Sequence, residues 1–123
     1  PYEDFLEGIA GFDYDGHKRM MANAEGGEYM AAYMKGFGSM INISAMSMQN
    51  GDKADEDSEA GFENFTHDGK KMRYGTEINE EEGGSVSGMV IEYPKHDMYI
   101  YIMCIPEKSK AEMLKMYSML NFK

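Results

Sequence analysis

An internal repeat is the feature of this sequence that most constrains its fold. When the chain is shifted by 57 positions, 9 of the 41 residues in 25–65 are identical to their counterparts in 82–122. Each half carries a Glu-Gly-Gly run, and Ile43 falls on Ile100. Such self-similarity indicates one supersecondary unit used twice. We therefore expect the two halves to share the same order of strands and helices.

The apolar pattern within each half predicts two strands joined by a short turn. His96–Ile105 is rich in Ile and Tyr, and its equivalent in the first half is Ser39–Met48. A second β-type run, Ser85–Tyr93, corresponds to Glu28–Met34. Asp-Gly pairs, which suit the positive φ angles of tight hairpins, add a third strand signal to each half. These pairs are Asp15-Gly16 and Asp68-Gly69.

The C-terminal segment predicts a helix. Ser109-Lys110-Ala111-Glu112 has the pattern of a capping box, and apolar residues follow it at helical spacing. These residues are Met113, Met116, Tyr117 and Leu120. The matching segment of the first half, Asp52-Lys53-Ala54-Asp55, predicts a second helix from about Lys53 to Ala60.

Two β-β-β-α units of this kind predict an α+β fold. We expect a mainly antiparallel sheet of about six strands, with the C-terminal helix and a second helix covering one face. The length suits a single domain over 1–123. The internal duplication would divide this domain into the pseudo-repeats 11–65 and 66–123.

Alternation along the two inner strands separates the faces of the predicted sheet. One face, expected to form the core under the helices, is apolar: Met98, Ile100, Ile102, Cys104, Ile41, Ile43 and Ala45. The other face mixes Tyr, Met and small polar side chains, and we name its six residues the predicted contact surface: Asn42, Ser44, Met46, Tyr99, Tyr101 and Met103. Two helices cover only one face of a sheet, so we expect this surface to bind a ligand or partner.

The charge of the chain excludes several classes of partner. A formal net charge of −10 argues against nucleic acid, whose binding depends on Lys and Arg neutralising phosphates. It also argues against anionic membrane surfaces. No uninterrupted apolar stretch approaches the ~20 residues of a spanning helix. The chain begins at Pro1 rather than Met, and we expect an exported bacterial protein, periplasmic or extracellular.

No motif in the sequence predicts catalysis. The single cysteine, Cys104, lies on the expected core face, where a thiol is normally inert. His17, His67 and His96 lie in predicted turns, where we expect them to be exposed and idle. The 14 Met residues lack the interleaved His of a copper site, and no segment has EF-hand spacing. We therefore predict no enzyme, no cofactor and no catalytic or metal-binding residues.

The second half also carries a family resemblance. Its segments are Asp68-Gly69-Lys70-Lys71, Val90-Ile91-Glu92-Tyr93, Tyr99-Ile100-Tyr101-Ile102 and Leu114-Lys115-Met116-Tyr117-Ser118. In their order they resemble the end of small secreted bacterial α+β domains of the PsbP-like type, in which hairpin strands lead to a final helix. The resemblance implies a non-catalytic exported domain that binds proteins or small ligands. It implies no particular functional residues.

These observations predict a non-enzymatic binding or protein-interaction module. Its partner would be a protein or a small apolar ligand, and a second copy of the chain could instead cover the predicted contact surface as a homodimer. An alternative function is an acidic inhibitor or immunity-type protein that blocks a basic enzyme. The acidic segments 52–59 and 80–82 favour that alternative, since their charge would speed association.

Overall fold

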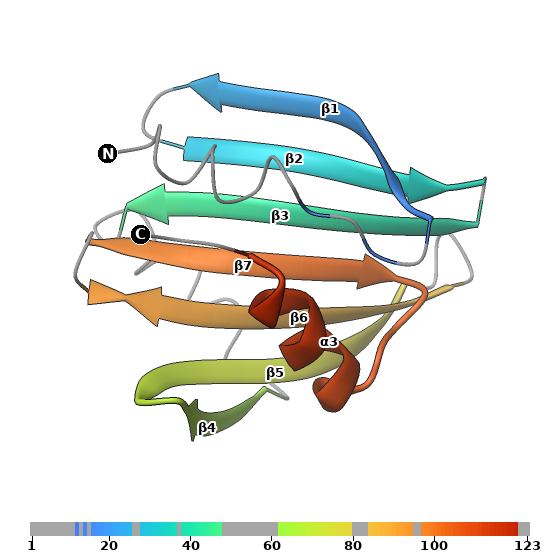
Figure 1. Cartoon of the computed structure of the whole chain (residues 1–123). Coiled ribbons are helices and arrows are strands. Elements are labelled where there is room, and N and C mark those ends of the chain that lie inside the picture. Colours follow the sequence, from blue (N-terminus) through green and yellow to red (C-terminus); the bar gives the residue numbers. More distant parts are fainter. Residues whose placement is uncertain are drawn as a thin grey trace.

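The chain folds into a seven-stranded antiparallel sheet with a helix lying across one of its faces (Figure 1). The computed structural model describes residues 12, 14, 16–25, 28–36, 38–47, 62–79, 84–94 and 97–120. The strands are β1 (Lys18–Glu25), β2 (Glu28–Lys35), β3 (Ser39–Ser47), β4 (Glu63–His67), β5 (Lys70–Asn79), β6 (Gly84–Tyr93) and β7 (Met98–Ile105). The helix is α3 (Lys110–Ser118).

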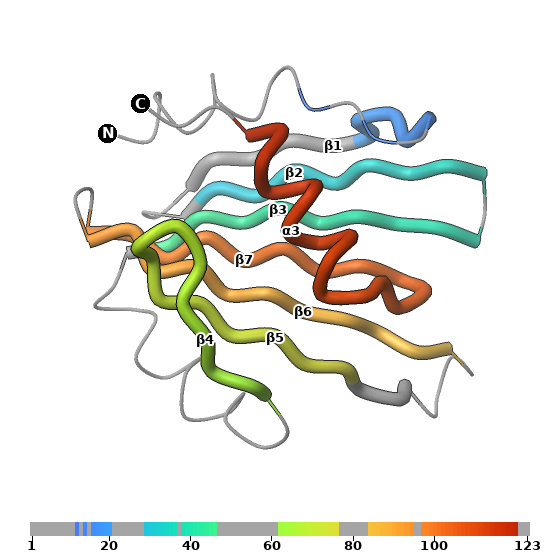
Figure 2. The backbone as a smooth tube through the Cα atoms, turned by 60° about the horizontal axis from the view of Figure 1, so that its bottom comes forward, coloured from blue at the N-terminus to red at the C-terminus, as the bar shows by residue number. Residues whose placement is uncertain are grey.

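The strand order, β1-β2-β3-β7-β6-β5-β4, consists of two meanders joined in the middle of the sheet. Strands β1 to β3 follow one another on one side, and β4 to β7 do so on the other. The junction is the antiparallel pair β3–β7, in which Ile43 lies opposite Ile102. The two strands predicted to be inner strands are therefore the centre of the sheet. Figure 2 shows the meanders on either side of this pair.

The α+β class, the antiparallel sheet and the C-terminal helix are confirmed, and the sheet has seven strands rather than about six. The predicted second helix, Lys53–Ala60, lies outside the described residues. The described part of the chain contains one helix, so the structure gives no support to a duplicated β-β-β-α unit. That duplication stays a prediction.

The two Asp-Gly signals have different outcomes. Asp68 and Gly69 form the two-residue turn between β4 and β5, with φ angles of 53° and 78°. This is the left-handed conformation that a tight hairpin requires. Gly16, with a φ of 77°, instead precedes β1. Asp15 lies outside the described residues, and Phe12 and Tyr14, which are described, are not in a strand.

The core lies between α3 and the sheet, as predicted. Every residue assigned to the core face is buried: Met98, Ile100, Ile102, Cys104, Ile41, Ile43 and Ala45. On the helix, Met113 and Met116 have no exposed surface, and both pack in the same cluster. Their burial beneath a nine-residue helix explains why a short amphipathic segment stays helical here.

A cap and two hydrogen bonds fix the start of α3. Ser109 has extended backbone angles, and its Oγ accepts a hydrogen bond from the Glu112 amide at 3.2 Å, as the capping box predicts. Just before it, the Lys108 amide donates to Ser87 Oγ at 2.9 Å. The Lys108 carbonyl accepts from the Tyr74 hydroxyl at 2.6 Å. The chain entering the helix is thus tied to β6 and β5.

His17 departs from the expectation of exposed histidines. It is buried, its Nδ1 lies 2.8 Å from the Tyr14 carbonyl oxygen, and its Nε2 lies 2.7 Å from Ser39 Oγ. These two contacts tie the segment before β1 to the start of β3. His67, at the β4–β5 hairpin, is exposed as expected.

Candidate functional site

The predicted contact surface is a continuous patch across the centre of the sheet. Its six residues face one another in three cross-strand pairs between β3 and β7: Asn42 with Met103, Ser44 with Tyr101, and Met46 with Tyr99. They alternate with the core residues, so they lie on the face opposite α3. Most are half-buried, and Tyr99 is 6% exposed.

The patch continues onto β2 through methionines that sequence reasoning missed. Met30 is paired with Ser44, and Met34 with Met40. All three methionines are half-buried, and Met30 and Met34 alternate with the buried Tyr29 and Tyr33. That alternation was readable in the sequence and would have added Met30 and Met34 to the surface. Flexible thioether side chains of this kind can adapt to ligands of different shapes.

Asn42 carries an unused polar atom within this patch. Its Oδ1 is buried and has no hydrogen-bond partner among the described residues. A buried acceptor left without a donor costs ~1–3 kcal/mol.

A pair of glycines shapes the neighbouring strands on the same face. Gly75 of β5 and Gly88 of β6 lie opposite each other, and the ring of Phe62 lies over both. The Tyr101 hydroxyl would lie 2.7 Å from a methyl group built on Gly88. The missing side chains therefore admit two aromatic rings close to the backbone of the sheet.

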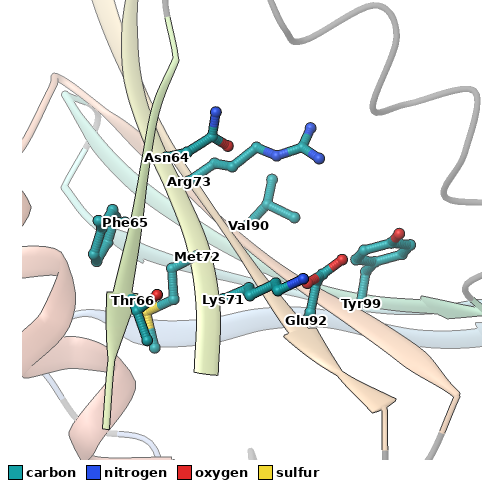
Figure 3. Close-up of a pocket in the computed structure, with 9 residues that line it drawn as sticks. All are labelled: Asn64, Phe65, Thr66, Lys71, Met72, Arg73, Val90, Glu92 and Tyr99. Atoms are coloured by element: carbon teal, nitrogen blue, oxygen red, sulfur yellow. The ribbon is translucent and has the colours of Figure 1, made fainter. Parts of the chain in front are cut away.

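A cavity of about 400 Å³ lies beside the predicted contact surface. Its lining comes from β4, β5, β6 and β7: Asn64, Phe65, Thr66, Lys71, Met72, Arg73, Val90, Glu92 and Tyr99. In Figure 3, Arg73 and Lys71 extend from β5 toward the side on which Val90, Glu92 and Tyr99 lie. Tyr99 belongs to both the cavity and the predicted contact surface.

The cavity has a polar side and an apolar side. On β4 and β5, Asn64 pairs with Arg73 and Thr66 with Lys71, so four hydrogen-bond donors form a compact group. The apolar side is formed by Val90 and Tyr99. Sequence reasoning missed this group although it predicted the hairpin at residues 68–69, because it did not extend that turn into the register that places Asn64 beside Arg73 and Thr66 beside Lys71.

Among the described residues, Glu92 is the only acidic residue that lines the cavity, and it is half-buried. It lies opposite Tyr99 in the β6–β7 ladder. The described lining therefore presents two cationic side chains and one carboxylate, in a chain where acidic residues outnumber basic residues by 22 to 12.

The cysteine lies on the other side of the sheet from the cavity. Its thiol is fully buried and lies 3.7 Å from Met116 Sδ. Burial raises the pKa of Cys104 to about 11. Such a thiol is a poor nucleophile near neutral pH. In the described part of the chain, no three His, Cys, Asp or Glu side chains come together as a metal site would require.

Two further expectations concern the acidic segments and membrane-crossing helices. The acidic segments 52–59 and 80–82 are outside the described residues. Among the helices that are described, none has both the length and the apolar character needed to cross a membrane.

Comparisons with family models, curated proteins and solved structures find no match to this chain. The resemblance to PsbP-like domains accordingly stays a prediction.

Proposed function

We propose that this chain is a non-enzymatic binding module that receives a small amphipathic ligand on the sheet face opposite α3. The observation that carries the proposal is the cavity of about 400 Å³ that adjoins the predicted contact surface at Tyr99. This volume lies within the usual range of small-molecule sites, roughly 300–1,000 Å³. A flat protein-docking face would not need such a recess.

The lining of the face supports a ligand with both apolar and polar parts. Met46 is the cross-strand partner of Tyr99, and Tyr101 lies two residues further along β7; both are half-buried, so a ligand could cover them at little cost in ordering. The cavity adds charged donors at one end.

Methionine methyl resonances provide a direct test, because both faces of the sheet carry methionines. We expect titration with 1-octanol to shift the methyl signals of Met46 and Met103. The signals of Met113 and Met116, which lie beneath α3, should stay in place and serve as internal controls. Equal shifts on both faces, or none on either, would contradict the proposal.

Two variants separate ligand binding from a general change in the fold. Met46→Gln keeps the length of a side chain on the face while making it polar, and we expect it to weaken octanol binding about threefold to tenfold. Met119→Gln is the matched control, since Met119 is 40% exposed at the end of α3. Similar weakening by both variants would count against the face.

The solution mass distinguishes a ligand site from self-association. We expect a monomer by light scattering at about 50 mM and about 500 mM salt, because a ligand site must remain open. A dimer that persists at both salt concentrations would assign the predicted contact surface to a second copy of the chain. That outcome would overturn the proposal.

A further inference from the structure

We infer that the ligand is a monoanionic amphiphile whose carboxylate is bound by Arg73 and Lys71 on the β4–β5 side of the cavity. This inference rests on the proposed function and specifies the chemistry of the ligand. Three observations support it: the position of Arg73 and Lys71 in the sheet, the apolar path beside them, and the Glu92 carboxylate in the same cavity.

The donor group suits a carboxylate. Arg73 and Lys71 are two residues apart on β5, so they lie on the same face of the sheet. Their cross-strand partners on β4, Asn64 and Thr66, add an amide and a hydroxyl to the same side. The planar fork of Arg matches the two oxygens of a carboxylate, and Lys supplies a second charge from its flexible stem.

The location of Arg73 and Lys71 allows their charge to attract an anion. The protein as a whole repels anions, with a formal charge of −10. Arg73 is half-buried at the cavity, where solvent screens a charge less than on an open surface. An anion that enters the cavity is therefore attracted locally although the distant field opposes it.

An apolar path leads away from the donors toward the centre of the sheet. Val90 lies between Arg73 on β5 and Tyr101 on β7, since it is the cross-strand partner of both. With adjacent strands ~4.8 Å apart, the distance from β5 to β3 is roughly 14 Å. A hydrocarbon chain attached to the carboxylate would lie across Val90 and Tyr101 and approach Ser44 and its same-face neighbour Met46 on β3.

Glu92 limits the charge of the ligand. It lines the same cavity as Arg73 and Lys71, so it opposes a second negative charge on the head group. A carboxylate with one charge therefore suits this cavity better than a phosphate monoester with nearly two. Removing the Glu92 charge should strengthen the binding of an anion, which an unspecific apolar site would not show.

The test compares three probes that share one hydrocarbon chain: octanoate, 1-octanol and octylammonium, titrated by calorimetry at pH 7. We expect octanoate to bind about tenfold more tightly than octanol, with octylammonium the weakest. Lys71→Gln should weaken octanoate about threefold to tenfold and weaken octanol much less, because a neutral hydroxyl gains no charge-assisted bond from Lys71. Lys71 is exposed, so this variant should fold normally.

Three further variants complete the test. Arg73→Gln should weaken octanoate more than Arg73→Lys, which retains the charge but loses the fork. Glu92→Gln should bind octanoate at least twofold more tightly. Lys115→Gln is the control, because it removes the same charge from an exposed position on α3.

The outcomes distinguish this inference from the proposed function. Equal affinity for octanoate and octanol would overturn the carboxylate site while leaving the binding module intact. Tighter binding of octylammonium would overturn it in favour of a cation held by Glu92. If none of the three probes binds, the proposed function itself fails.

Discussion

Gly75 on β5 lies directly opposite Gly88 on β6, and the ring of Phe62 packs against both glycines. Glycine weakens a strand interior, since it provides no side chain to pack. Here an aromatic ring from the segment before β4 supplies the missing contact. The absence of a side chain at Gly88 also lets the Tyr101 hydroxyl approach the backbone of β6.

We expect Gly75→Ala to destabilise the protein by ~1–3 kcal/mol in urea unfolding, because its methyl group would overlap the Phe62 ring. Gly38→Ala is the matched control, since nothing lies within 4 Å of a methyl group at that position. Its effect should stay within ~0.5 kcal/mol. The double variant Gly75→Ala/Phe62→Ala should lose less stability than the sum of the losses in the two single variants. Losses that add strictly would show that Phe62 does not pack against the glycines.

Ser87→Ala should loosen the entry to α3. The Ser87 hydroxyl is buried and accepts the Lys108 amide, so its removal leaves that N–H without its partner. We expect a loss of ~1–2 kcal/mol and faster hydrogen exchange at the Lys108 amide. Ser118→Ala, which removes an exposed hydroxyl bonded to the Lys115 carbonyl, is the control. Unchanged exchange at Lys108 in the Ser87 variant would contradict the expectation.

The N-cap of α3 can be tested with a neutral and a charged replacement of Ser109. Ser109→Ala should lower the free energy of unfolding by ~1 kcal/mol, because the Glu112 amide loses its acceptor. Ser109→Asp should retain most of the stability, since a carboxylate accepts the same bond and favours the helix N-terminus. Thermal unfolding of the two variants measures the difference. Equal losses would mean that the hydroxyl has another role.

Cys104 should react slowly with iodoacetamide while the protein is folded. With the pKa raised from 9.0 to about 11 by burial, the thiolate fraction near pH 8 falls about a hundredfold. The comparison is with the protein unfolded in urea, where the ordinary pKa returns. Equal rates in the two states would show that the thiol is accessible.

The same shift makes folding sensitive to alkali. The unfolded chain releases the Cys104 proton near pH 9, whereas the folded chain holds it until about pH 11. Stability should therefore fall across this window, by up to ~2–3 kcal/mol. Cys104→Ala should remove that part of the pH dependence. Tyr33 and Tyr117, whose pKa values burial raises to about 12, should leave a residual loss at higher pH.

Strand alternation made the central part of the fold predictable. The pattern of Met98, Ile100, Ile102 and Cys104 separated core from surface, and all four are buried. The capping sequence at Ser109 placed the start of α3 correctly. Both signals are local, since each depends on residues a few positions apart in the chain.

The cavity could not be predicted in the same way. Its polar side requires Asn64 beside Arg73, and its opposite side requires Tyr99 next to Glu92 on a neighbouring strand. These pairs depend on strand order and register across four strands. In the sequence, Lys71 and Arg73 are two basic residues among twelve. Only the folded sheet distinguishes them from the others.

The central position of β7 has a consequence for synthesis on the ribosome. Strand β7 emerges after β1 to β6, yet it lies between β3 and β6 in the finished sheet. Each earlier meander can pair locally while nascent, but both then expose an unpaired strand edge. When β7 inserts between β3 and β6, it pairs with both of these edges. The nascent chain is therefore most prone to aggregate just before β7 leaves the exit tunnel, and a chaperone would help most at that moment.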